Sequence, residues 1–296
     1  MTKRSEMLRF VEESKMKIAI AAASGQLGSA VVKALLQFTP SHQVVALART
    51  VERAMSLGVE VRLGDYNQQA QLEKSLQGID TLLMVTSMSH ADERMIQHRN
   101  VITAAQRAGV RKIVYTSIQG AEHDTAFSPV VQSNRKTELM LQQSGLDWVI
   151  GRNGIYIEPD VEYLNEYDAA GEVANSAGDG LCGYTTRDEL AYAYAKLLTD
   201  DKHNGQIYNL NGQSMSQYQL VHYLNETFNT HLVYVPMDTE AFRLSRIPEL
   251  GDFLGNVVGG IYESIQTNQL NNESQFYAAA GRDHITWDEY FQRLKS

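Results

Sequence analysis

The chain lacks the cysteines that a disulfide framework or a cysteine-rich zinc site would need. Its 296 residues include one cysteine, Cys182, so an intramolecular disulfide is impossible. Neither a histidine nor a cationic cluster stands beside Cys182 in the sequence, and we therefore expect a small buried residue rather than a nucleophile. The histidines at positions 90, 98 and 123 are not paired at metal-ligand spacing, so the sequence predicts no metal site.

Long apolar runs are also missing, and positive charge is in the minority. No stretch approaches the roughly 18 to 20 apolar residues of a membrane helix, and the opening MTKRSEMLRF has no apolar signal region. The 26 Lys and Arg against 35 Asp and Glu give a formal net charge of −9, which argues against a broad nucleic-acid interface. We therefore expect a cytoplasmic chain that binds neither nucleic acid nor a membrane.

Short apolar segments rich in β-branched residues alternate with helical periodicity through the first half of the chain. These segments cover residues 17–23, 43–48, 59–64, 80–86, 112–117 and 147–152. Such runs are typical of buried parallel strands. Their alternation with helices over short links predicts right-handed crossovers. The expected fold class is α/β, with a doubly wound parallel sheet of the Rossmann type.

Helical periodicity dominates after Tyr156, with one further strand expected at 205–212. We therefore expect a smaller, helix-rich C-terminal lobe that is interleaved with the sheet domain. The expected division is an N-terminal extension over 1–15, a Rossmann-type sheet domain over 16–155 that 185–211 completes, and a second lobe over 156–184 and 212–296. The extension is either a surface helix or a frayed segment.

The segment KIAIAAASGQLGSAVVKALL, residues 17–36, has the order strand, glycine-containing turn, helix. This order is typical of a dinucleotide-binding loop, in which N–H groups at the helix start face a pyrophosphate. Gly25 would let the backbone approach the phosphates, and Gly28 would let the helix pack close to the strand. Ser24 offers a hydroxyl to a phosphate oxygen. The alternative is an ordinary strand-to-helix turn.

Ala22 stands where such a loop usually carries its first glycine. If this position needs a positive φ, an alanine there costs on the order of 1 kcal/mol. If it does not, the added methyl group only crowds the pyrophosphate. Either effect weakens cofactor binding without forbidding it. The chain contains neither a Walker loop nor a G-x-S-x-G elbow as another candidate motif.

Two side chains after the second and third expected strands bear on cofactor choice. An NAD-preferring chain carries an acidic residue after the second strand for the ribose 2′-hydroxyl, whereas this one has Arg49, which suits a 2′-phosphate. The alternative is a solvated arginine at a helix start. Asp65 is a candidate acceptor for the adenine amino group, or else the N-cap of the following helix.

Several ordered motifs resemble the NmrA-like branch of the atypical short-chain dehydrogenases/reductases. They are IAIAAASGQLG, VALART, GDY, QHRNVITAAQRAGVRKIVYTS, SGLDWVIGRNGIY and TTRDELAYAYAKLL. Within that branch the sequence is most similar to the bacterial NADPH-dependent quinone oxidoreductases. The resemblance runs from Met16 to about Leu210 and continues more weakly beyond it. It implies a Rossmann-type domain, NADPH binding and a substrate cleft between the lobes.

The resemblance also implies cofactor contacts at four places. The phosphate loop falls on Ala22, Ser24, Gly25, Gln26, Leu27 and Gly28, and the arginine for the 2′-phosphate falls on Arg49. The loop that lies along the cofactor falls on Thr86, Ser87 and Met88. The segment near the nicotinamide falls on Asn153, Gly154, Ile155 and Tyr156.

The sequence departs from the superfamily where a Tyr-x-x-x-Lys pair is used for proton transfer. By register, the tyrosine position falls on Val130 and the lysine position on Asn134, so the pair is absent. Lys136 lies two places later, about 200° around a helix, and does not replace the lysine.

The remaining catalytic candidates are Ser117 and Tyr156. Ser117 stands where the superfamily has its catalytic serine, with a strand-end hydroxyl bound to backbone as the alternative. Tyr156 would form a stacking wall of the substrate site, or else a core aromatic at the lobe junction. Pro159 occupies the place of an asparagine that the quinone-reducing relatives carry near the nicotinamide.

These observations predict an NADPH-dependent oxidoreductase that transfers hydride to a quinone or a related carbonyl substrate. The alternative is a non-catalytic NADP(H)-sensing NmrA-like regulator, and a third reading is a chain in which Ala22 has abolished cofactor binding. The expected partner is a quinone-like small molecule, and a homodimer is a possible assembly.

Overall fold

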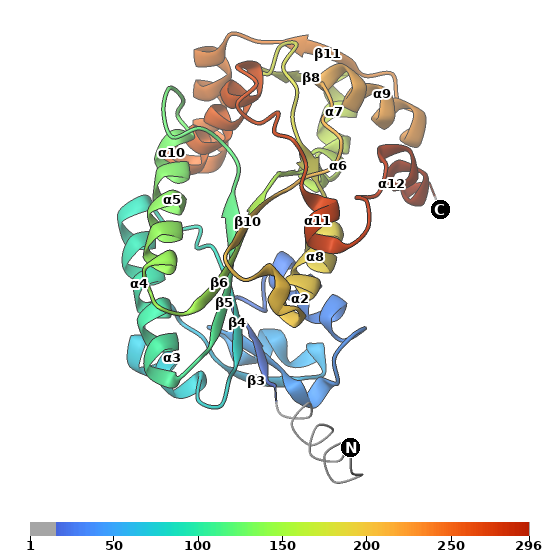
Figure 1. The fold of residues 1–296 in the computed structure, drawn as a ribbon. Coiled ribbons are helices and arrows are strands. Elements are labelled where there is room, and N and C mark those ends of the chain that lie inside the picture. The colour runs from blue at the N-terminus through green and yellow to red at the C-terminus, as the bar shows by residue number, and fades with distance from the viewer. Residues whose placement is uncertain (1–15, 296) are drawn as a thin grey trace.

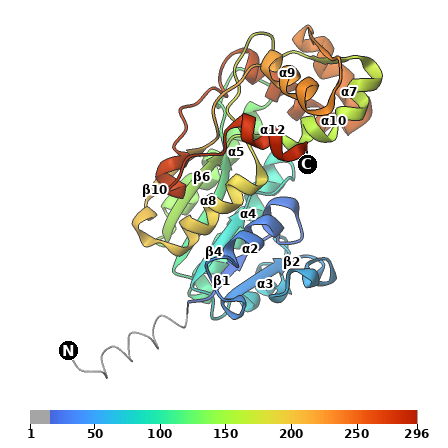
Figure 2. The same cartoon turned by 90° about the vertical axis from the view of Figure 1, so that its right-hand side faces the viewer.

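The computed structural model describes residues 16–295, so the expected extension over 1–15 lies outside the described residues. A sheet flanked by helices forms the lower part of the molecule in Figure 1, and a helix-rich lobe lies beyond one end of the sheet. Figure 2 shows α7, α9, α10 and α12 of that lobe together, above the sheet. The expected α/β class with a helix-rich C-terminal region is confirmed.

The described residues contain a seven-stranded parallel sheet in the order β10-β6-β5-β4-β1-β2-β3. Each expected strand is present, and the seven are β1 (Ile18–Ile20), β2 (Val44–Ala48), β3 (Glu60–Leu63), β4 (Thr81–Val85), β5 (Lys112–Ile118), β6 (Asp147–Asn153) and β10 (Gln206–Leu210). The chain winds from β1 out to β3, then returns to β4 on the other side of β1. This reversal defines the doubly wound Rossmann topology.

Helices cover both faces of the sheet because successive strand side chains point to opposite sides. One face is covered by α2 (Gln26–Leu35) and α8 (Arg187–Thr199). The other face is covered by α3 (Gln69–Ser75), α4 (Ala91–Ala108) and α5 (Ser128–Gln142). Helix α4 ends at Gly109, its left-handed cap at φ 79°.

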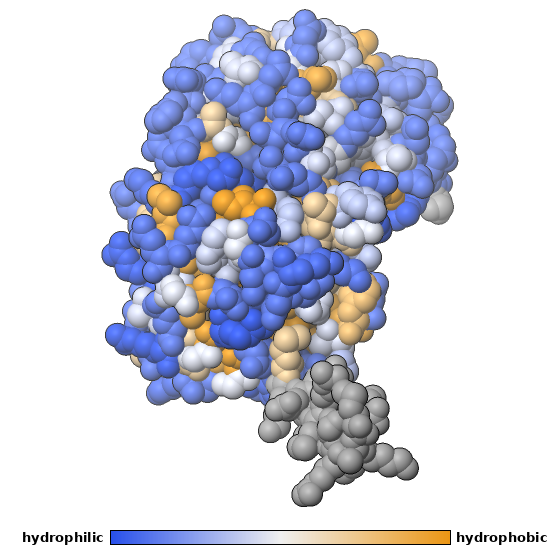
Figure 3. Space-filling model, in the orientation of Figure 1, coloured by the Kyte–Doolittle hydropathy of each residue, from blue (hydrophilic) through white to orange (hydrophobic). Residues whose placement is uncertain are grey.

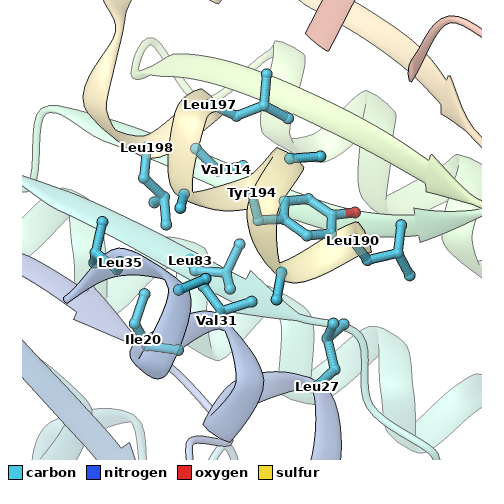
Figure 4. Close-up of a cluster of buried hydrophobic side chains, with 14 of the residues drawn as sticks. Ile20, Leu27, Val31, Leu35, Leu83, Val114, Leu190, Tyr194, Leu197 and Leu198 are labelled. Carbon is cyan, nitrogen blue, oxygen red and sulfur yellow. The ribbon is translucent and has the colours of Figure 1, made fainter. Parts of the chain in front are cut away.

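The core between the sheet, α2 and α8 shows why residues 185–200 pack with the first half of the chain. Figure 4 shows Val31 of α2 and Leu190 of α8 in one cluster with Leu83 of β4 and Val114 of β5. These four side chains are fully buried. Helix α8 therefore completes the apolar layer over the sheet although it lies far from α2 in the sequence.

The C-terminal lobe holds elements that the sequence analysis missed. Two short parallel pairs are formed, β7 with β9 and β8 with β11. The strands are β7 (Ile155–Tyr156), β8 (Glu172–Asn175), β9 (Tyr184–Thr185) and β11 (Val233–Pro236). Pairs of two to four residues are too short to show a strand period in a sequence.

The remaining helices are α6 (Glu158–Glu162), α7 (Leu164–Ala170), α9 (Gln217–Phe228), α10 (Thr239–Gln266), α11 (Phe276–Ala280) and α12 (Trp287–Leu294). Short 3₁₀ helices occur at 41–43, 51–57 and 201–203. Helix α10 is broken at Gly251, whose φ of 79° and ψ of 165° are not helical, shortly after Pro248. The helical periodicity expected after Tyr156 thus includes a helix that is divided into two halves.

Polar side chains cover most of the molecular face in Figure 3, with apolar residues in small groups between them. Within residues 16–295, no helix is long and apolar enough to cross a membrane. Cys182 is fully buried and unpaired, and burial raises the pKa of its thiol. The expectation that Cys182 is buried is therefore confirmed, and a raised thiol pKa disfavours the reactive thiolate.

Glu189 of α8 links the sheet domain to residues 282–285 near the C-terminus. Its carboxylate accepts two hydrogen bonds from Arg282, at 2.6 and 2.8 Å, and one from the Ile285 amide at 3.0 Å. Burial raises the pKa of Glu189, but the Arg282 and Ile285 donors outweigh it, so the pKa is lowered overall.

Replacing this carboxylate gives the first testable prediction. Glu189→Gln should lower the free energy of unfolding by about 1.5 to 3 kcal/mol at neutral pH, as expected for hydrogen bonds to a charged group. Because the folded-state pKa is lowered, the stabilisation is present above the unfolded-state pKa and is lost as the pH falls through the folded-state value. Urea unfolding of both chains across this pH range measures the difference.

The matched control is Glu240→Gln, which removes an exposed ion pair with Arg243 on α10. An exposed pair contributes little, so this variant should unfold like the unaltered chain. A Glu189→Gln effect that stays constant from neutral to acidic pH would contradict the assignment.

Candidate cofactor and substrate site

The crevice at the carboxyl ends of β1 and β4 is the place where a doubly wound sheet binds its ligand. These strands are neighbours, although β2 and β3 lie between them in the sequence. The turn at 21–25 follows β1, and the loop at 86–90 follows β4. Strand β6 continues directly into β7 of the C-terminal lobe, so the carboxyl edge of the sheet faces that lobe.

The turn after β1 is held in a tight conformation by Ala22. The φ of Ala22 is 51°, in the left-handed region. Its carbonyl accepts the Gly25 amide at 2.9 Å, and the Ala23 amide donates to the Leu47 carbonyl of β2 at 3.0 Å. The first of the two alternatives for this position therefore holds: it needs a positive φ, and alanine is strained there.

Gly28 and Gly25 leave the backbone of this turn open to a ligand. A Cβ atom on Gly28 would lie 2.3 Å from the Ala22 carbonyl oxygen, so only glycine allows α2 to begin so close to the turn. Gly25 is the N-cap of α2, and no side chain of the described residues caps that first turn. Ser24 is half-exposed, and Gly25 and Gln26 are exposed. The open helix start fits a phosphate group.

Relieving the strain at Ala22 gives the second prediction. Ala22→Gly should raise the free energy of unfolding by up to about 1 kcal/mol, because glycine adopts a positive φ without steric cost. Thermal or urea unfolding measures the change, and NADPH titration of the same variant should show equal or tighter binding.

Gly28→Ala is the contrasting variant, since its added methyl group would collide with backbone. It should weaken both stability and cofactor binding. A loss of stability in Ala22→Gly would contradict the strain at position 22.

Arg49 and Asp65 follow the ends of β2 and β3. Arg49 is exposed and has no hydrogen bond or ion pair with any residue in 16–295, so its guanidinium is available to a ligand. The Asp65 carboxylate accepts the Asn67 amide at 2.9 Å. The N-cap of α3 is Gln68, so the expectation that Asp65 caps this helix is wrong. Asp65 instead holds a turn that brings the chain from β3 to α3.

The loop after β4 is fixed by side chains of α4. The Ser87 amide donates to His98 Nε2 at 3.0 Å, and the Ser87 hydroxyl donates to Gln97 Oε1. His98 Nδ1 lies 2.8 Å from the Thr137 hydroxyl of α5. Met88, which follows, is 70% exposed. The loop backbone is thus rigid at Ser87, and Met88 projects outward.

His98 is held in one neutral tautomer. Since Nε2 accepts the Ser87 amide, the proton lies on Nδ1, which donates to Thr137. Burial lowers the pKa of His98 to about 3, with a further contribution from the positive charge of Arg94. A lowered pKa means that the unfolded chain binds a proton that the folded chain does not.

The third prediction follows from this pKa. The His98 ring should stay neutral, with its proton on Nδ1, at every pH above about 4, well below the usual value of about 6.5. Its contribution to stability should be complete above the unfolded-state pKa and decrease as the pH falls toward the folded-state value. An NMR titration of the imidazole nitrogens measures the protonation state, and a proton on Nε2 near neutral pH would refute the tautomer.

Asn134 of α5 takes part in a buried polar network. Its Oδ1 accepts the Tyr115 hydroxyl at 2.6 Å and the Thr86 hydroxyl at 3.0 Å. Its amide nitrogen donates to the Val130 carbonyl at 2.9 Å. The exposed Lys136 is not part of this network. Asn134 thus fixes the first residue of the loop after β4.

Ser117 is fully buried beneath α5. Its hydroxyl donates to Glu138 Oε1 at 2.6 Å, so the expectation of a hydroxyl bound to backbone is wrong. The same carboxylate accepts Arg135 at 2.7 Å and Arg152 at 2.6 and 3.0 Å. A buried carboxylate attracts donors from every element around it, and Ser117 is one of them.

The segment after β6 is anchored by Tyr194 of α8. The Tyr194 hydroxyl donates to Asn153 Oδ1 at 2.6 Å, and the Asn153 amide donates to the Tyr156 hydroxyl at 3.4 Å. A Cβ atom on Gly154 would lie 2.2 Å from the Gly183 carbonyl, so the segment packs closely against the lobe. Ile155 and Tyr156 are half-buried, and burial raises the pKa of Tyr156 to about 12.

A cavity of about 220 Å³ lies next to Tyr156 in the C-terminal lobe. Its walls are mainly aromatic and aliphatic, with one buried carboxyl group and one guanidinium. The lining residues are Ile155, Tyr156, Pro159, Asp160, Tyr163, Tyr167, Ala174, Asn175, Tyr184, Phe242, Arg246, Leu250, Val258, Ile261, Tyr262 and Ile265. An apolar cavity with few polar groups is typical of a site for a small, flat molecule.

The cavity brings together residues that the sequence analysis did not single out, chiefly Asp160, Tyr167 and Tyr262. The stretch DVEYLNEY places Asp160 and Tyr167 seven residues apart, which is the one local signal of a shared face. Tyr262 comes from α10, about a hundred residues later, so no sequence pattern joins it to them. Within residues 16–295, no group of three or more metal-ligating side chains is found.

The fold and the open loop define a dinucleotide-binding protein of the Rossmann class. The chain belongs to the NAD(P)H-binding, NmrA-like family of oxidoreductases. The NAD(P)H-binding family model matches residues 22–201. An NmrA-like family domain-containing oxidoreductase of Aspergillus flavus is 31% identical, over 72% of this chain and 71% of the relative. The resemblance noted in the sequence is thus confirmed.

Other similar proteins include reductases. Quinone oxidoreductase 2 of Escherichia coli is 40% identical over 203 residues, which cover 67% of this chain and 69% of the relative. The crystal structure of NADPH-dependent quinone oxidoreductase QOR2 from Escherichia coli in complex with NADPH matches with a TM-score of 0.86 and 31% identity, over 94% of this chain and 100% of that one. Triphenylmethane reductase of Citrobacter with NADP(H) gives a TM-score of 0.86 and 30% identity over the same shares.

Proposed function

We propose that this oxidoreductase uses NADPH to reduce a quinone or a related carbonyl compound held in the cavity beside Tyr156. The observation that carries the proposal is the uncapped start of α2, which opens at the β1–β4 crevice. The similarity to a quinone oxidoreductase solved with NADPH supports the choice of cofactor and substrate class.

The division of labour between the two parts of the chain follows from this proposal. Residues 16–155, with 185–211, would bind the cofactor, and residues 156–184 and 212–296 would form the substrate lobe. The cavity supports this division because its lining comes from 155–184 and from α10. A cytoplasmic location and a homodimer remain predictions.

The chain's own residues would bind and orient the reactants. The first turn of α2 would hold the pyrophosphate, with Ser24 beside it, and Arg49 would pair with the 2′-phosphate. Asn153, held by Tyr194, would orient the segment that faces the nicotinamide. When bound, the reduced nicotinamide supplies the hydride. Tyr156 would stack on the substrate ring, and the apolar walls would exclude water.

Thr86, Ser87 and Met88 would lie along the cofactor in this arrangement. The contacts of Ser87 with His98 and of Thr86 with Asn134 support that role, because they fix the loop before any ligand binds. A fixed loop lowers the entropic cost of binding. We do not assign Ser117 a catalytic role, since its hydroxyl is buried against Glu138. The absence of a Tyr-x-x-x-Lys pair, with Val130 and Asn134 at those places, is part of the proposal.

A non-catalytic sensor of NADP(H) is the competing function, and turnover separates the two. Family membership favours the oxidoreductase. A purified chain that consumes NADPH in the presence of 1,4-benzoquinone, with hydroquinone as the product, would establish it. Tight NADPH binding without turnover of quinones or other carbonyl compounds would favour the sensor.

Cofactor choice gives the fourth prediction. Arg49→Ala should weaken NADPH binding about tenfold to a hundredfold, the loss of one charge-assisted contact, and leave NADH binding unchanged. Titration of both nucleotides by calorimetry measures the two dissociation constants.

Arg107→Ala is the matched control, because Arg107 is an exposed arginine of α4 outside the crevice and the charge change is the same. An equal loss of NADPH and NADH affinity in Arg49→Ala would contradict recognition of the 2′-phosphate.

A further inference from the structure

The buried carboxyl group of Asp160 lies in the wall of the cavity with one oxygen unused. The residue is 5% exposed. Its Oδ1 accepts the Tyr167 hydroxyl at 3.1 Å and the Tyr262 hydroxyl at 3.3 Å. Its Oδ2 has no hydrogen-bond partner among residues 16–295. Asp160 lines the cavity, so this oxygen is left free to form a hydrogen bond with a ligand there.

The neighbouring walls fit a flat ring next to that oxygen. Tyr163, Tyr167, Phe242 and Tyr262 line the same cavity, and Tyr156 lines it on the side of the sheet domain. Aromatic side chains stack on or pack edge-to-face against a planar substrate. A quinone in this cavity therefore lies within reach of both Tyr156 and Asp160.

We propose that Asp160 donates the proton that a quinone needs when it is reduced, an inference that rests on the proposed function. Hydride addition brings an electron pair and one hydrogen to the quinone. The O–H bond of the Asp160 carboxyl group breaks, and its proton forms a new O–H bond on the quinone oxygen, which gives the hydroquinone. The Asp160 carboxylate then regains a proton from water.

The two tyrosines suit the carboxylate that this step leaves behind. Their hydroxyl groups donate to Oδ1, the oxygen that does not face the substrate. Hydrogen bonds to the charged form stabilise it. The proton is thus carried on Oδ2 while Tyr167 and Tyr262 hold the group in position.

The charge state of Asp160 agrees with this role. Burial raises the pKa of its carboxyl group to about 6, against the smaller opposite effect of the Tyr167 and Tyr262 hydroxyls. An acid with a pKa near the working pH is the most effective proton donor. Tyr156, with a pKa of about 12, is a hydrogen-bond donor at neutral pH and keeps its proton.

The buried tyrosines and the cysteine around Asp160 stay neutral in this range. Burial raises the pKa of Tyr184, Cys182 and Tyr262, and burial and Asp160 raise that of Tyr167, so all four stay neutral. Arg246 also lines the cavity and pairs with Glu249 at 3.1 Å. Tyr163 bonds to Glu249 as well, which raises the pKa of its hydroxyl.

The fifth prediction concerns Asp160→Asn. In the unaltered chain, kcat for 1,4-benzoquinone should be constant at acidic pH and decline as the pH rises through about 6, because the protonated acid is the active form. Asp160→Asn should lower kcat about a hundredfold on the acidic side, as expected for the loss of a general acid, and remove the pH dependence. The NADPH dissociation constant should not change.

A hydride acceptor that needs no proton distinguishes the loss of the acid from structural damage by the substitution. The 10-methylacridinium cation accepts a hydride without protonation, so its kcat should be the same in Asp160→Asn and in the unaltered chain. The control variant is Asp168→Asn, the same change at an exposed residue of α7. It should behave like the unaltered chain with both acceptors.

A second variant keeps the test decisive if Asp160→Asn does not fold. Tyr262→Phe removes one donor to the carboxylate, so the pKa of Asp160 should rise and the decline of kcat should move to higher pH. An unchanged pH profile in Tyr262→Phe would overturn the inference.

The remaining outcomes distinguish the two proposals. Quinone reduction by Asp160→Asn at the unaltered rate, or an equal loss with both acceptors, would overturn the proton-donor role and leave the proposed function intact. NADPH binding without quinone reduction in the unaltered chain would overturn the proposed function, and the role of Asp160 with it.

Discussion

The close approach of α2 to the turn after β1 is the constraint on which the rest of the site depends. Gly28 lies so close to the Ala22 carbonyl that even one added carbon atom has no room. This contact fixes where α2 begins and directs its N–H groups into the crevice. The alanine at φ 51° shows that the chain tolerates a cost of about 1 kcal/mol to keep the turn tight.

The loop after β4 and the segment after β6 are held in place by buried polar side chains. His98 and Asn134 fix the loop after β4, and Tyr194 fixes the segment after β6. These bonds cross between elements that are distant in the sequence. In the cavity, Asp160 is the acidic group, and its Oδ2 has no hydrogen-bond partner among residues 16–295. In the proposed function, the sheet domain would supply a rigid frame, and the lobe would supply the polar chemistry.

Much of the fold could be predicted from the sequence because parallel strands are buried on both faces. Their apolar runs, such as 112–117, stand out against the helical periodicity around them. The loop with Gly25 and Gly28 was recognisable for the same local reason. Asp160 and Tyr262 were not, because their contact spans 102 residues. The partners of Ser117 and Asp65 were also missed, since a sequence does not show which donor a buried oxygen meets.

The ion-pair cluster of Arg135, Glu138 and Arg152 makes the fold sensitive to the loss of any one charge. The Glu138 carboxylate is buried and pairs with two guanidinium groups at once, of which that of Arg152 is partly exposed. Losing one partner of a buried ion pair costs about 3 to 5 kcal/mol, which is a large share of the 5 to 15 kcal/mol or so that keeps a domain folded. Removing one of the three charges would therefore leave another uncompensated and threaten the whole fold.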